Sequence, residues 1–130
     1  KLTNEEIAAI IGVMAACPRQ LFQVLTKRSA RMVEWFAWLE SQAIKVEAVP
    51  TALTRVSLLI GYTLKAMEAA GLKSRGLEFS LMPPWPLANL HLGVSVEAAA
   101  YRYRLDDLRE CPAAVRFCSI SGVCRWVPMA

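Results

Sequence analysis

The sequence has no long hydrophobic run and no catalytic signature. Its longest apolar stretch without a charge spans residues 56–64, between Arg55 and Lys65, and is too short to cross a bilayer. It contains neither a glycine-rich phosphate loop nor the residue order of a Ser-His-Asp or Cys-His catalytic set. No secretory signal pattern opens it. We therefore expect a cytoplasmic protein without a membrane partner, and no motif here names a reaction.

Cysteine and histidine are too few and too widely spaced to indicate a metal site. None of the four cysteines forms a C-x-x-C pair, and the single histidine, His91, is far from all of them in the sequence. Such spacing argues against a zinc or iron–sulfur site built from this chain alone. We expect buried reduced thiols and no metal. The cysteines are Cys17, Cys111, Cys118 and Cys124.

The charge is mild and evenly spread. The net charge is +4, and cations and anions are interspersed along the chain without a basic tract. Nucleic-acid binding is therefore permitted but not indicated. With 130 residues and 55% hydrophobic residues, the chain can form one domain, residues 1–130, with a substantial core. Apolar surface in excess of that core would favour self-association.

Local signals in the first half predict a helix, a strand and a second helix. Thr3 and Glu6 have the spacing of a capping box, so a helix should begin near Asn4 and end before Pro18. Residues 21–26 are apolar and β-branched, as in a short buried strand. The period then becomes helical, with Ser29 as the expected N-cap residue.

The second half predicts two further helices and two further strands. A helix should follow Thr51 and stop at Gly71, with Leu53 among its inward-facing residues. Residues 72–86 form a loop rich in glycine, serine and proline. Strands at 90–96 and 115–120 flank a helix at 97–110, in which Arg102 is spaced to pair with Asp106.

The predicted order is helix, strand, helix, helix, strand, helix, strand. Strands separated by helices pair in parallel through right-handed crossovers, so we expect a helix-rich α/β domain. The strand at 90–96 alternates between apolar residues and a row containing His91, Gly93 and Ser95. A parallel sheet covered on both faces should be apolar on both. Two arrangements remain: a small three-stranded parallel sheet with helices mainly on one face, or a partial βα barrel with a polar lumen.

Candidate ligand-binding residues gather at the carboxyl ends of these strands. Cations at that position suit a phosphate or carboxylate, and the helix beginning at Ser29 would add its N-terminus. The candidates are Lys27, Arg28, Ser95, Glu97 and, within its strand, His91. Each has a structural alternative. The two cations can be solvated turn residues, the histidine a hydrogen-bonded core residue, and the glutamate a favourable charge at a helix N-terminus.

Two stretches carry a family resemblance. The first is VLTKR, residues 24–28, and the second is WPLANLHLGVSVE, residues 85–97. They resemble the phage-associated family named after phage gene products thirty-seven and sixty-eight, whose members look like radical S-adenosylmethionine proteins built on a βα barrel. The resemblance covers residues 5–117, apart from a variable helix at 51–73. It implies a phage or mobile-element origin and places Lys27, Arg28, Ser95 and Glu97 at a barrel mouth, in contact with cofactor or substrate.

The departures from that family bear on the cofactor. Its members carry an upstream cysteine-rich segment that looks like the ligand set of an iron–sulfur cluster, and nothing in this chain corresponds to it. By resemblance, the chain is the middle of a barrel without its cluster-binding start or its closing strands. We therefore expect no cofactor for this chain alone. S-adenosylmethionine is the one that the resemblance implies.

Three functions remain open. The first is a small α/β domain, non-catalytic alone, that forms a homo-oligomer or binds a protein partner. The second is part of a radical enzyme that binds S-adenosylmethionine or a nucleotide at the strand ends. The third is a nucleic-acid accessory protein, with phosphate contacts from Lys27, Arg28, Arg31, Arg102 and Arg104.

Overall fold

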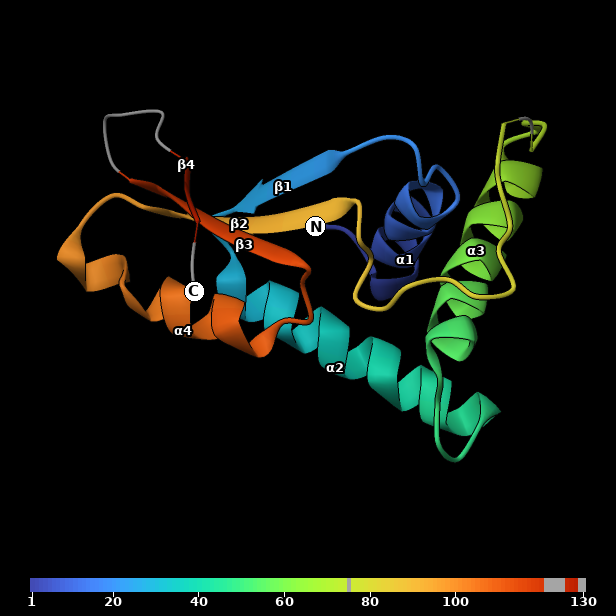
Figure 1. The fold of residues 1–130 in the computed structure, drawn as a ribbon, viewed down its shortest axis with the longest axis horizontal. Coiled ribbons are helices and arrows are strands. Elements are labelled where there is room, and N and C mark those ends of the chain that lie inside the picture. Colours follow the sequence, from blue (N-terminus) through green and yellow to red (C-terminus); the bar gives the residue numbers. More distant parts are fainter. Residues whose placement is uncertain (75, 121–125, 129–130) are drawn as a thin grey trace.

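The computed structural model describes residues 1–74, 76–120 and 126–128, which form an α/β fold (Figure 1). The helices are α1 (Asn4–Ala15), α2 (Ser29–Val46), α3 (Ala52–Ala69) and α4 (Tyr103–Glu110), with a 3-10 turn at Ala99–Tyr101. The strands are β1 (Phe22–Thr26), β2 (Leu90–Val96), β3 (Val115–Ile120) and β4 (Trp126–Pro128). The predicted order of helices and strands is confirmed, and the short β4 is an addition.

The sheet has the order β1-β2-β3-β4, and its first three strands are parallel. Strand β4 runs antiparallel to β3. Val24 lies opposite Leu92, and Val94 lies opposite Cys118, so the even-numbered residues of the three parallel strands share one face. The three-stranded parallel sheet with helices, one of the two predicted arrangements, is therefore present.

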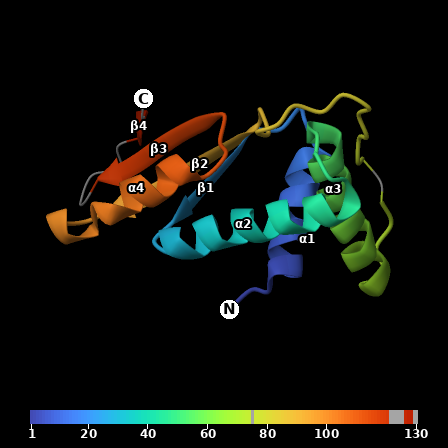
Figure 2. The same cartoon turned by 90° about the horizontal axis from the view of Figure 1, so that it is seen from below.

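The core lies between this even-numbered face and the helices. Helices α2 and α4 run along one side of the strands (Figure 2), and α1 packs beside α3 (Figures 1 and 2). Apolar side chains from both layers are buried together, because burying them is the main favourable contribution to folding. Those with the least exposure include Leu92, Val94, Leu39, Leu59 and Leu108.

The ends of α1 and α3 follow the local signals. The Thr3 hydroxyl accepts from the Glu6 N–H, and the Glu6 carboxylate accepts from the Thr3 N–H, so the predicted capping box is confirmed. Helix α3 begins after Thr51 and is followed by Gly71, which has a φ of 70°. The Leu72 N–H donates to the carbonyl of Met67 at 2.8 Å, as in a Schellman motif, for which glycine is the preferred residue.

Four local predictions are wrong. The N-cap residue of α2 is Arg28, and no side chain of the described residues caps this helix, because the Ser29 hydroxyl instead donates to Asp107 of α4 at 2.6 Å. The helix predicted at 97–110 begins only at Tyr103, after the 3-10 turn. The predicted pair of Arg102 with Asp106 is the third wrong prediction, because Arg102 lies before α4 and Asp106 pairs with Arg109 at 3.0 Å.

The fourth wrong prediction concerns the inward face of α3. Leu53 is 40% exposed, while Thr54 and Thr63 are buried. These threonines can lie inside because their hydroxyls have partners: Thr54 donates to the Glu47 carboxylate and Thr63 to the Ala9 carbonyl. Burial without such partners would be costly.

Two close contacts join the helices and the sheet. At Gly12 of α1, an added Cβ would lie 2.1 Å from the Thr63 Oγ1 and 2.3 Å from the Leu59 carbonyl oxygen of α3, so only glycine fits. The Asn89 amide, just before β2, donates from Nδ2 to three carbonyls at the end of α1 and in the turn before β1. They belong to Met14, Cys17 and Gln20. None of the helices in the described ranges is long and apolar enough to span a membrane.

Candidate functional site

A cluster of charged residues surrounds Glu97, directly after β2. The Glu97 carboxylate accepts hydrogen bonds from the Ser95 hydroxyl at 2.6 Å and from Arg104 Nη1 at 2.8 Å. Lys27, directly after β1, lies 3.1 Å away through its Nζ. Because β1 and β2 are parallel neighbours, their carboxyl ends meet at one edge of the sheet. We call Lys27, Ser95, Glu97 and Arg104 the carboxylate cluster.

Arg104 is the buried member of the carboxylate cluster. The residue is only 7% exposed, and its Nη1 also donates to the Ser95 carbonyl at 2.6 Å. Its guanidinium carbon lies 4.3 Å from the centre of the Tyr101 ring, a cation–π distance. Its Nε is buried and has no hydrogen-bond partner in the described ranges. The Nε–H of the buried Arg104 therefore has no partner among the described residues at this edge of the sheet.

The hydrogen bonds keep Glu97 ionised. The Ser95 hydroxyl, then Lys27 and to a smaller extent Arg104, lower the pKa of the Glu97 carboxyl to about 2. A group with that pKa is a poor general acid or base near neutral pH, where catalysis needs a pKa close to the working pH. Two cations flank one carboxylate, so the carboxylate cluster carries a net positive charge and suits an anionic ligand group.

The structure brings together three of the five candidates predicted from the sequence: Lys27, Ser95 and Glu97. Arg28 follows Lys27 in the chain but is exposed and lines a groove between α1 and α2. His91 lies opposite Gln23 near the start of β2. It is six residues from Glu97, which corresponds to roughly 20 Å at the rise per residue of a β-strand.

Arg104 was missed as a member of this site. The sequence suggested it only as a phosphate contact. Its real partner depends on the turn at Ala99–Tyr101, which folds the start of α4 back onto Glu97. The signal in the sequence was slight: an arginine next to tyrosines, seven residues after a glutamate at a strand end.

The odd-numbered face of the parallel strands is the second notable feature. Helices α2 and α4 lie on the opposite side of the sheet (Figure 2), and Leu25 and Val115 are 47% and 38% exposed. Phe117 is buried on this face against Gly93, where an added Cβ would lie 2.1 Å from its ring. We call this surface the open face. It carries Gln23, Leu25, His91, Ser95, Val115 and Ser119.

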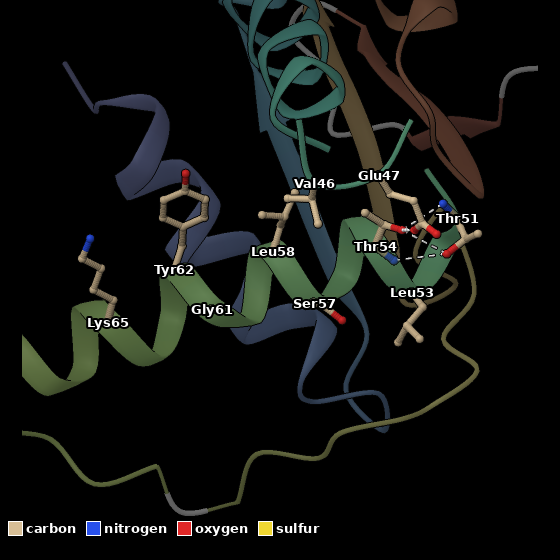
Figure 3. A pocket seen from close by; sticks show the side chains of 10 residues that line it. All are labelled: Val46, Glu47, Thr51, Leu53, Thr54, Ser57, Leu58, Gly61, Tyr62 and Lys65. Atoms are coloured by element: carbon tan, nitrogen blue, oxygen red, sulfur yellow. Dashed lines mark hydrogen bonds between the residues drawn. The ribbon is translucent and has the colours of Figure 1, made fainter. Parts of the chain in front are cut away.

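Two depressions lie away from the carboxylate cluster. One follows α3 and the end of α2, with Leu58, Tyr62 and Lys65 projecting from the same helix (Figure 3). Three of its polar side chains are engaged with one another, since Thr54 bonds to both Thr51 and Glu47. The other, of about 370 Å³, lies between α1, β1 and α2, and we call it the α1–α2 groove.

The thiols do not form a metal site in the part of the chain that the structure describes. No group of three potential metal-binding side chains occurs there. Cys111 and Cys118 are buried and unpaired, Cys17 is half-buried, and Cys124 lies outside the described residues. Burial raises the pKa of the Cys111 thiol to about 12, so the free thiol remains protonated near neutral pH. The three thiols that the structure describes do not fit an iron–sulfur cluster.

Comparison with known proteins places the chain in a family. No curated protein and no solved structure matches it. A family model described as "Protein of unknown function (DUF5131)" matches residues 1–129, which is almost the entire chain. The chain therefore belongs to the DUF5131 family of proteins of unknown function.

Proposed function

We propose that this chain is a binding domain, non-catalytic on its own, that associates with a second copy of itself through the open face. The observation that carries the proposal is a sheet with helices packed on its even-numbered face and with exposed apolar side chains, Leu25 and Val115, on the other. A phage or mobile-element setting rests on the sequence resemblance alone.

The edge of the sheet adds a second reason for association. Strand β1 is the first in the sheet order and pairs only with β2 in the described part of the chain. An edge of this kind presents unpaired N–H and C=O groups, which favour the addition of another strand. The open face ends in both a cation, Lys27, and an anion, Glu97, so two copies can meet in opposite orientations without net repulsion.

The test compares two Val→Lys variants. Val115→Lys places a charge on the open face, whereas Val49→Lys places one in the α2–α3 connection, where Val49 is 81% exposed. Sedimentation equilibrium over a wide range of concentrations should show dimers for the wild type and for Val49→Lys. It should show monomers for Val115→Lys, with unchanged circular dichroism. A wild-type chain that stays monomeric throughout would overturn the proposal.

A second candidate function is ligand binding at the carboxylate cluster. The observation that favours it is the Nε of Arg104, buried and unpartnered within the described ranges, beside a lysine whose side chain is 68% exposed. Ligands of α/β proteins bind beyond the carboxyl ends of parallel strands. The ligand we propose is S-adenosylmethionine or a nucleotide, with Lys27 at the carboxylate or phosphate and Glu97 at the amine or ribose hydroxyls.

Titration calorimetry with S-adenosylmethionine and with adenosine triphosphate tests this second function. We expect uptake of one of them, weakened by about tenfold in Lys27→Gln, since a charge-assisted contact is lost. Lys45→Gln, at the exposed end of α2, is the matched control and should bind as the wild type does. Absence of heat from both ligands at millimolar concentration would remove this function.

Nucleic-acid binding gains no support from the arrangement of the five basic residues. Arg104 is buried, the side chain of Arg31 is only 16% exposed, and Lys27 is paired with Glu97. These residues therefore do not present the continuous basic surface that phosphate contacts require.

A further inference from the structure

We propose that the α1–α2 groove binds a small organic anion with an apolar body, such as a medium-chain carboxylic acid. This site is separate from the carboxylate cluster and shares only Leu25 with the open face, and the proposal rests on neither function above. It rests on the shape of the groove, on the sign of the charges that line it, and on the hydrogen bonding of one arginine.

The groove has the size and surface of a small-molecule site. Its volume is about 370 Å³, within the usual range for pockets that hold small ligands. Its lining is mostly aliphatic and aromatic, contributed by α1, the first two strands and α2. The apolar lining includes Ile11, Met14, Val24, Met32, Trp35 and Leu92.

The charged residues that line the groove are all cations: Lys1, Arg28 and Arg31. No acidic residue contributes to the lining, and the Trp35 indole is engaged with the Asn4 carbonyl at 3.0 Å. An apolar surface with positive charges alone at its margin favours a ligand with one anionic end. The same charges disfavour a second copy of the groove as the occupant, because like charges would face one another.

Arg31 supplies the donors for the anionic end. Its Nη2 donates to the Leu2 carbonyl at 3.1 Å. Its Nε and Nη1 are buried and have no hydrogen-bond partner among the described residues. The carboxylate that pairs with it, Glu34, is 3.8 Å from Nη1 and 67% exposed, beyond hydrogen-bond distance. Two donors of an arginine in an apolar groove therefore remain for the oxygens of a ligand.

Decanoate and its neutral analogue decan-1-ol are the probes for this site. Calorimetry below the micelle concentration should show decanoate binding about tenfold more tightly than decan-1-ol. Arg31→Gln should remove this preference and leave decan-1-ol binding unchanged. Arg102→Gln, an exposed arginine just before α4, is the matched control and should preserve the preference.

A groove-filling variant guards against a folding artefact. Ile10 lines the groove but is 45% exposed, so Ile10→Trp should fold and should abolish binding of both probes. Equal affinity for the acid and the alcohol, or unchanged decanoate binding in Arg31→Gln, would overturn the proposal. Binding to phosphatidylglycerol vesicles without binding of free decanoate would indicate a lipid surface instead, and would also overturn it.

Discussion

The contact between α1 and α3 at Gly12 yields the sharpest prediction about the fold. Replacing Gly12 by alanine adds a Cβ that would lie 2.1 Å from the Thr63 Oγ1 and 2.3 Å from the Leu59 carbonyl oxygen. Because Leu59 contributes backbone atoms, rotation of a side chain cannot relieve the clash. The two helices must separate by about 1 Å to reach ordinary contact distances. Separation also stretches the 2.7 Å bond from Thr63 to the Ala9 carbonyl.

The expected cost follows from these contacts. Overpacking of this kind costs about 1–3 kcal/mol, and loss of the Thr63 hydrogen bond adds about 1 kcal/mol. The better helix propensity of alanine offsets about 1 kcal/mol of this destabilisation. The free energy of unfolding should therefore fall by about 2 kcal/mol. For a chain of this length the melting temperature should fall by roughly 5–10 °C.

Gly61→Ala is the matched control, because no atom of the described residues lies within 4 Å of a Cβ added to this exposed residue of α3 (Figure 3). The same substitution should there raise the free energy of unfolding by about 0.5–1 kcal/mol, from helix propensity and reduced freedom of the unfolded chain. Urea denaturation followed by circular dichroism measures both variants. A Gly12→Ala protein as stable as the wild type would refute the close packing of α1 on α3.

Three further predictions concern single side chains. The pKa of Glu97 is about 2 in the folded protein and near 4.5 in an ordinary glutamate. As the pH falls, Glu97 is therefore protonated in the unfolded chain before it is protonated in the folded one. The stability that Glu97 contributes should be complete above pH 4.5 and be lost as the pH falls toward 2. In urea titrations, the free energy of unfolding of Glu97→Gln should not show this loss at low pH. Identical pH profiles for the variant and the wild type would contradict the prediction. Asn89→Asp should lower the free energy of unfolding by about 1–3 kcal/mol, since a carboxylate would face three carbonyls. Gln23→Glu, on the exposed strand surface, should change it little. Iodoacetamide in mildly alkaline buffer should modify Cys17 well before the buried Cys111, as read by mass spectrometry, and the reverse order would be inconsistent with the raised pKa of Cys111.

The elements of the fold were predictable because their ends carry local signals. The capping box at Thr3, the start after Thr51 and the stop at Gly71 each involve residues within a few positions of one another. The polar row beginning at His91 predicted either a sheet with helices mainly on one face or a partial βα barrel, and the first of these is present. Alternation in a strand reports directly which residues share a face.

The links between distant elements were not predictable in the same way. Ser29 bonds to Asp107, 78 residues away in the sequence, so its role as an apparent N-cap is replaced by a contact that only the packing of α2 on α4 creates. Arg104 meets Glu97 only because a 3-10 turn shortens α4. Helix periodicity describes one element at a time and carries no information on such contacts. The resemblance to the phage family remains a prediction.

Sedimentation equilibrium of the wild type beside Val115→Lys and Val49→Lys tests the central claim most directly. Association of the wild type and of Val49→Lys, abolished only by Val115→Lys, is the result expected if the open face is the binding surface. A wild-type chain that remains monomeric at every concentration, or association that Val115→Lys leaves intact, would contradict it.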